Sequence, residues 1–98
     1  MRPYRPRYTP EVAGRIRKLH PEVKREIRTA VRTLLSAPLS GRELQFELSG
    51  YHSYRVRTYR IIYRINDDDA MLDVVFIGPR RTVYEELKSL IKKRERES

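Results

Sequence analysis

The sequence predicts an α+β domain in which an N-terminal helical hairpin packs on a small, mostly antiparallel sheet, followed by a C-terminal helix. Two amphipathic helical patterns occupy residues 10–35, extended apolar segments fill residues 53–77, and a third helical pattern follows. Because segregated helices and strands are typical of α+β folds, we expect the helices on one face of the sheet. The 98 residues suffice for one domain, residues 1–98, with one modest core.

The first third of the chain favours a short strand and then two helices. Prolines flank residues 4–8 and restrict them to an edge strand. Thr9 and Pro10 are typical of the N-cap and first position of a helix, and Pro21 begins a second helix. Each helix has apolar residues at helical spacing: Val12, Ile16 and Leu19 in the first, and Val23, Ile27, Val31 and Leu34 in the second.

Residues 43–48 are ambiguous. Leu44, Phe46 and Leu48 alternate with polar residues and are expected on one side, which fits either a strand or an extended connection. Further along, residues 71–77 form a nearly continuous apolar run, which favours a central strand. Gly78 and Pro79 end that strand, and Thr82 is the expected N-cap of the last helix.

The segment between these regions predicts a hairpin of residues 53–56 and 59–65 around a turn at Arg57 and Thr58. With this two-residue turn, Arg55 lies opposite Arg60. Side-chain alternation then gives two faces. The core face holds Tyr54, Val56, Tyr59, Ile61, Tyr63 and Ile65, and the other face holds Ser53, Arg55, Arg60, Ile62 and Arg64.

Composition limits the partners and the chemistry. Lys and Arg number 22 against 13 Asp and Glu, a net charge of +9, so the expected partners are nucleic acid or an acidic protein segment. The absence of cysteine excludes disulfides, thiolate metal sites and thiol catalysis, and is compatible with the reducing cytoplasm, the expected location. No apolar run predicts a membrane span or a signal peptide.

The cationic face of the hairpin is the candidate site. Like charges directly opposed on a sheet destabilise it, yet Arg55 faces Arg60 and Arg64 extends the row. Any one of these arginines alone would be read as a solvated charge. Together with Arg80 and Arg81 after the next strand, they favour an anion site beside a helix N-terminus. Tyr84, one turn into that helix, is either a packing aromatic or a hydroxyl delivered to the arginines.

The sequence gives little support to other combinations of catalytic residues. The two histidines, His20 and His52, are scattered, and Asp67–Asp69 is typical of a solvated turn. We therefore expect no metal and no cofactor. Metal-free phosphodiester chemistry remains, in which arginines stabilise a pentavalent phosphate. RNA supplies its own nucleophile, the 2′-OH.

The segments ELSGYHSYRVRTYRIIYRIN and DVVFIGPRRTVYEEL resemble the RelE/ParE toxin superfamily of type II toxin–antitoxin systems, and within it the RelE-like mRNA interferases. The resemblance covers nearly the whole chain. It implies a toxin that cleaves mRNA in the ribosomal A site by metal-free 2′-OH attack and so inhibits translation. It also implies a cognate antitoxin, which the +9 charge suggests is acidic and which would be encoded next door.

The resemblance and the cationic face together assign the site residues. The expected catalytic residues are Arg60, Arg80 and Tyr84, and the expected RNA-binding residues are Arg55, Arg57, Arg64 and Arg81.

The proton acceptor stays open. RelE has lysines in the first hairpin strand where this chain has Arg55 and Arg57, and arginine stays protonated. The base is therefore sought among Tyr84, His52 and Glu47. Two other functions remain as alternatives: a ParE-like topoisomerase (gyrase) inhibitor and a non-catalytic RNA- or protein-binding module.

Overall fold

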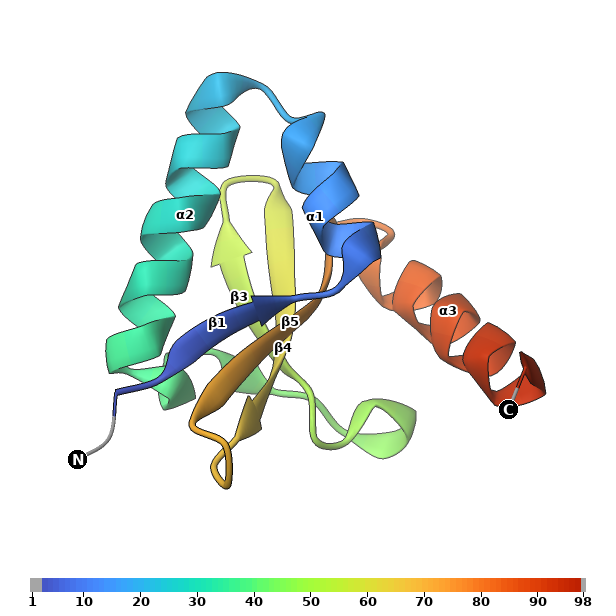
Figure 1. The fold of residues 1–98 in the computed structure, drawn as a ribbon. Helices are drawn as coiled ribbons and strands as arrows, with labels where there is room; N and C mark the ends of the chain where they lie inside the picture. Colours follow the sequence, from blue (N-terminus) through green and yellow to red (C-terminus); the bar gives the residue numbers. More distant parts are fainter. Residues whose placement is uncertain (1–2, 98) are drawn as a thin grey trace.

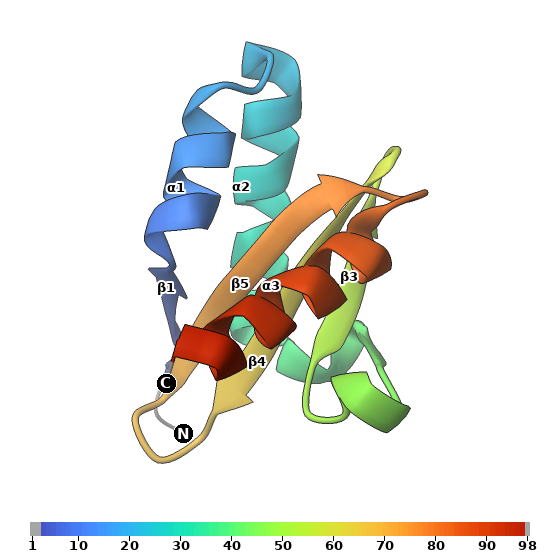
Figure 2. The ribbon, with the colours of Figure 1, turned by 90° about the vertical axis from the view of Figure 1, so that its right-hand side faces the viewer.

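A computed structural model of the protein describes residues 3–97 and shows one mixed five-stranded sheet with helices on both sides (Figure 1, Figure 2). The strand order is β1-β5-β4-β3-β2. The elements are β1 (Arg5–Tyr8), α1 (Pro10–Arg17), α2 (Pro21–Ser36), η1 (Pro38–Ser40), β2 (Arg42–Glu43), η2 (Phe46–Leu48), β3 (His52–Val56), β4 (Tyr59–Asn66), β5 (Met71–Pro79) and α3 (Val83–Glu97). Among the described residues, no helix has the length and apolar character needed to cross a bilayer.

The N-terminal helical hairpin forms as predicted, with a proline in the first turn of each helix. The Thr9 hydroxyl accepts a hydrogen bond from the Val12 backbone N–H at 3.2 Å. At the start of α2, His20 Nδ1 accepts one from the Glu22 N–H, also at 3.2 Å. These side chains satisfy backbone donors that the first turn of a helix leaves unpaired.

The sheet has the predicted hairpin register. Val56 pairs with Tyr59 and Arg55 with Arg60 across the β3–β4 turn. Arg57 in that turn adopts φ 55°, a left-handed conformation that a two-residue hairpin turn requires. β1 lies at one edge, parallel to β5, and β5 is an interior strand, both as expected.

The structure corrects the expected position of the last helix, because the sheet has a hydrophobic cluster on each face. On one face, Ile61 packs with residues of α1 and α2. On the other face, Ile62 and Phe76 pack with Val83 and Leu87 of α3. The α1–α2 hairpin and α3 therefore cover opposite faces, and the expectation of all helices on one face is wrong. The cause is the apolar surface that β4 and β5 expose on the cationic side, which requires a cover.

Residues 43–48 are mostly not a strand. Only Arg42–Glu43 pairs with β3, and Phe46–Leu48 forms a 3₁₀ turn. Leu44 and Leu48 are buried, but Phe46 has φ 56° and its side chain is 84% exposed. The positive φ turns Phe46 outward, so the expectation that all three apolar side chains share one side is wrong.

Tyr63 anchors the connection after α2 to the sheet. Its side chain is fully buried, its hydroxyl donates to the Pro38 carbonyl at 2.6 Å, and it accepts from the Gly41 N–H at 3.0 Å. Gly41 has an ordinary extended φ of −79°, so its requirement for glycine is steric. A Cβ there would overlap the Tyr63 hydroxyl and lie 2.9 Å from Tyr63 Cε1.

Gly41→Ala should therefore lower the free energy of unfolding by about 1–3 kcal/mol, the usual cost of overpacking. Gly14→Ala is the matched control, since a Cβ there would meet only the end of the Arg17 side chain at 3.9 Å. Because alanine favours a helix over glycine, this control should be neutral or stabilising by up to about 1 kcal/mol. Urea denaturation measures both, and equal effects would contradict the steric account.

The stability of the protein should also depend on Tyr63 at alkaline pH. Burial raises the Tyr63 pKa, and the hydrogen bond from Gly41 only partly opposes this. The folded state therefore keeps the phenol proton to higher pH than the unfolded chain, whose tyrosine pKa is about 10. The resulting stabilisation is complete below about pH 10 and is lost as the pH rises through the folded-state pKa.

Tyr63→Phe tests this contribution. At pH 8 it should cost about 1–3 kcal/mol, because the Gly41 N–H and the Pro38 carbonyl lose their partner. Above pH 10 the difference from the parent should shrink, since only the parent has a Tyr63 proton to lose. Denaturation curves between pH 8 and 11 measure this, and parallel pH profiles would be the contrary result.

Candidate functional site

A buried serine joins an arginine and a tyrosine on the α3 side of the sheet. Ser53 of β3 is 2% exposed. Its hydroxyl accepts a hydrogen bond from Arg60 Nη1 at 3.2 Å and another from the Tyr84 hydroxyl at 3.1 Å. The Arg60 guanidinium carbon also lies 5.9 Å from the centre of the Tyr84 ring. The residues come from β3, β4 and α3, so the cluster exists only because α3 covers this face.

Arg60 keeps an unused donor inside this cluster. Its Nε atom is enclosed and has no hydrogen-bond partner within the described residues. A buried donor without a partner costs about 1–3 kcal/mol. An anion that reached this nitrogen after a small movement of the surrounding side chains would recover that cost. The Arg60 side chain is thus anchored through one nitrogen and unsatisfied at another.

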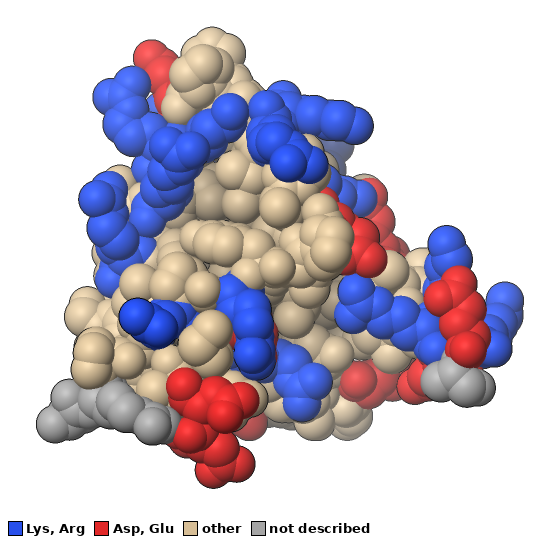
Figure 3. Space-filling model, in the orientation of Figure 1, with Lys and Arg blue, Asp and Glu red and all other residues tan. Residues whose placement is uncertain are grey.

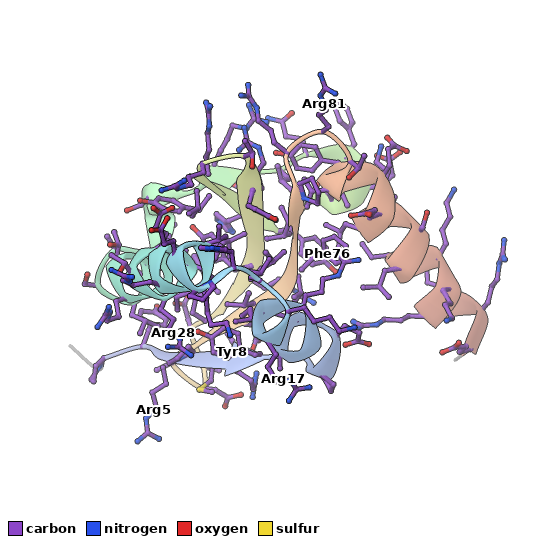
Figure 4. All side chains as sticks on the ribbon, turned by 90° about the horizontal axis from the view of Figure 1, so that it is seen from above. Arg5, Tyr8, Arg17, Arg28, Phe76 and Arg81 are labelled. Atoms are coloured by element: carbon purple, nitrogen blue, oxygen red, sulfur yellow. The ribbon has the colours of Figure 1, made fainter. Side chains whose placement is uncertain are left out.

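Arg55, Arg80 and Arg81 are exposed cations on segments next to this centre. Arg55 lies directly across the sheet from Arg60, and its Nε donates to the Arg57 carbonyl at 3.3 Å. The Arg80 backbone N–H donates to the Thr58 carbonyl at 2.6 Å, which holds the end of β5 against the hairpin turn. Figure 4 shows Arg81 extending outward from the loop that precedes α3.

Within the described part of the chain, no ion pair is found between a carboxylate and Arg55, Arg60, Arg80 or Arg81. Within residues 3–97, the ion pairs found involve Arg7, Arg15, Arg57 and Arg94 instead. The space-filling view in Figure 3 shows further basic side chains along α2, while acidic side chains gather near the β4–β5 turn. An excess of positive charge without paired carboxylates is the electrostatic pattern of an anion-binding surface.

Two of the predicted RNA-binding arginines lie away from the centre. Arg57 forms an ion pair with Glu26 of α2, and the hydrogen bond and charge of that carboxylate raise the Arg57 pKa. Arg57 is therefore held toward the helical hairpin. Arg64 lies four residues beyond Arg60 along β4, with its guanidinium carbon 5.3 Å from the centre of the Tyr51 ring.

The structure separates two of the three candidate bases from Arg60. His52 stacks on Tyr63 with ring centres 5.3 Å apart, on the sheet face opposite Ser53, and its enclosed Nδ1 has no hydrogen-bond partner within the described residues. Glu47 lies in η2, beside a pocket of about 290 Å³ that Lys88 and Lys92 of α3 also line. Tyr84 is the candidate that contacts Arg60.

Metal-binding side chains do not gather anywhere in residues 3–97, where no group of three or more His, Asp or Glu side chains is placed to hold an ion. Ser53 is a site residue that was not predicted from the sequence. Its signal was present, because the predicted register already put this small polar residue on the cationic face, diagonal to Arg60.

Comparison with known proteins identifies the family. The family model described as the ParE toxin of the type II toxin–antitoxin system parDE matches residues 6–84. Toxin RelG of Mycobacterium tuberculosis is 32% identical over 84 residues, which cover 84% of this chain and 97% of RelG.

Solved structures agree with this assignment. A chain of the RelBE2 toxin–antitoxin complex from Mycobacterium tuberculosis superposes with a TM-score of 0.72 at 32% identity, covering 80% of this chain and 99% of that one. A mutant of the E. coli toxin RelE in the free state gives a TM-score of 0.77 at 20% identity, covering 95% of this chain and 98% of that one, and so supports the fold. The chain belongs to the RelE/ParE toxin superfamily and is a toxin of a type II toxin–antitoxin system.

Proposed function

We propose that the protein is an endoribonuclease toxin that cleaves mRNA on the ribosome and thereby inhibits translation. The observation that carries this proposal is the cluster of Arg60 and Tyr84 on Ser53. Exposed arginines on the neighbouring segments have no carboxylate partner among residues 3–97. Such a cluster offers fixed positive charge and a hydroxyl to one phosphate group. Membership of a toxin superfamily supports the same proposal.

The proposed reaction uses the nucleophile that RNA carries. The 2′-OH gives up its proton and attacks the adjacent phosphorus, and the bond from phosphorus to the 5′ oxygen breaks. The leaving 5′ oxygen takes up a proton, so a 2′,3′-cyclic phosphate and a 5′-OH result. Arg60 and Arg80 stabilise the charge of the pentavalent phosphate, because guanidinium groups donate in a fixed, planar arrangement. The Tyr84 hydroxyl assists a proton transfer, and the ring can in addition stack on a base.

The remaining arginines contact RNA at different distances from the scissile phosphate. Arg55 and Arg81 hold the RNA backbone next to the scissile phosphate. Arg57 and Arg64 lie farther out and contact RNA only beyond that phosphate. Arginine stays protonated, so none of these groups serves as the general base.

The proposed partners are a cognate antitoxin and mRNA on the ribosome, both met in the cytoplasm. Several structural neighbours are chains of toxin–antitoxin complexes, among them one from Mycobacterium tuberculosis and one from E. coli. The net charge of +9 suits an acidic antitoxin segment. A small acidic protein encoded beside this chain would support this pairing.

A second function is favoured by one observation, the match to the ParE toxin family model. Under that alternative the protein inhibits a topoisomerase and cleaves no RNA. Expression separates the two, because protein synthesis stops first under the nuclease proposal, whereas DNA damage signalling appears first under the alternative. A non-catalytic RNA-binding module would give neither cleaved mRNA nor damage signalling.

Arg80→Ala and Tyr84→Phe should each relieve growth arrest and reduce mRNA cleavage on programmed ribosomes. Loss of one group that stabilises the transition state typically costs about 100-fold to 1000-fold in rate. Arg80 is exposed and Tyr84→Phe keeps the ring, so both variants should fold. Arg28→Ala, an equal loss of charge on the exposed face of α2 (Figure 4), is the control that should still arrest growth. Arrest by both site variants at parental strength would refute the assignment.

Arg55 and Arg57 should differ in their effect on cleavage, although both are exposed arginines of one hairpin. Arg55→Ala should raise KM for mRNA on the ribosome several-fold, because it removes an unpaired cation beside Arg60. Arg57→Ala should change KM less, because Glu26 already neutralises Arg57. Steady-state kinetics of the two variants measure this difference, and a larger effect of Arg57→Ala would reverse the ranking.

A further inference from the structure

We propose that Ser53 is the positioning residue of this site, and that its hydroxyl fixes Arg60 and Tyr84 in the arrangement that cleavage requires. The inference rests on the proposed nuclease function but concerns a residue to which neither the sequence pattern nor the comparisons assign a role. Ser53 contacts the two groups that act on RNA and lies too deep, at 2% exposure, to reach RNA itself.

Hydrogen-bond chemistry sets the direction of both contacts. A guanidinium group can only donate, so Arg60 occupies one lone pair of the serine oxygen. The Tyr84 hydroxyl donates to the same oxygen and occupies the second lone pair. Both acceptor positions are then in use, away from competing water. One oxygen atom therefore determines where two longer side chains lie.

The serine oxygen is itself held firmly. Ser53 pairs with Ile62 of β4 on one side and with Arg42 of β2 on the other, so its backbone lies inside the sheet. A serine side chain has a single rotatable bond to its oxygen, whereas Arg60 has several. Tyr84 belongs to α3, a separate element packed on this face. Ser53 thus fixes the Arg60 side chain and the start of α3 relative to the sheet.

This arrangement leaves the right atoms free for RNA. Arg60 is tethered through Nη1 alone, so its guanidinium group keeps other donors for a phosphate. The enclosed, unpaired Nε becomes one of them only when the surrounding side chains move. The Tyr84 hydrogen is directed to Ser53, so lone pairs of the phenol oxygen can accept a hydrogen bond from an RNA hydroxyl. Loss of Ser53 should therefore lower kcat and leave KM nearly unchanged, because Arg55, Arg80 and Arg81 still hold the backbone.

The kinetic test uses Ser53→Ala, Ser53→Thr and Ser53→Cys in mRNA cleavage on programmed ribosomes. Ser53→Ala should lower kcat about 10-fold to 100-fold, the effect of losing a hydrogen bond to a charged group, with KM within about twofold. Ser53→Thr retains the hydroxyl and should recover most of the loss, and Ser53→Cys, a weak acceptor, should fall between. Ser49→Ala, an exposed serine in a turn, is the matched control and should match the parent.

A double-mutant cycle separates positioning from general stability. Tyr84→Phe removes the hydroxyl that binds Ser53, so Ser53→Ala should cost clearly less in that background than in the parent. The inference would be overturned if Ser53→Ala lowered kcat by the same factor in Tyr84→Phe as in the parent. It would also be overturned if Ser53→Ala raised KM and left kcat unchanged. Urea denaturation of each variant ensures that only folded protein is compared.

A second measurement needs no catalysis. NMR relaxation of the Arg60 Nε–H group in the free protein should show an ordered side chain in the parent and in Ser53→Thr, and a mobile one in Ser53→Ala. An Arg60 that stays equally ordered in Ser53→Ala would overturn the inference. If the parent protein does not cleave mRNA, the proposed function fails, and this measurement still decides whether Ser53 holds Arg60.

Discussion

The structure depends on a strand that is apolar on both faces. In β4, Ile61 faces the α1–α2 hairpin while its neighbour Ile62 faces the other way, and both are fully buried. A sheet with one apolar face needs one layer of helices, but this sheet needs two. Val83 and Leu87 of α3 supply the second layer. Covering Ile62 is therefore what brings the start of α3, with Tyr84, to the arginines of the hairpin.

The site is built by placing positive charge where sheet packing alone would not favour it. Arg55 opposite Arg60 is a like-charge pair, which costs stability in a sheet. The structure compensates with neutral oxygen atoms, not with carboxylates: Arg60 donates to the Ser53 hydroxyl and Arg55 to a backbone carbonyl. These contacts hold the guanidinium groups without cancelling their charge. The charge stays available to an anionic ligand, which the proposed RNA cleavage requires.

Membership of the RelE/ParE superfamily and the chemistry of the site support different conclusions about this protein. The relatives establish the fold and the class of toxin. They do not establish which chemistry this chain performs, since the superfamily model that matches is named for the ParE toxin. RNA cleavage is supported instead by particular side chains, above all by Arg60 and Tyr84 meeting at Ser53.

The helix starts, the hairpin register and the cationic face could be predicted from the amino-acid sequence, because they follow from interactions between residues close along the chain. Caps, turn length and side-chain alternation are local rules. Only the tertiary structure decided that α3 covers the second face, that Ser53 joins Arg60 to Tyr84, and that Arg57 pairs with Glu26. These contacts join residues far apart in sequence, and packing of the whole core sets them.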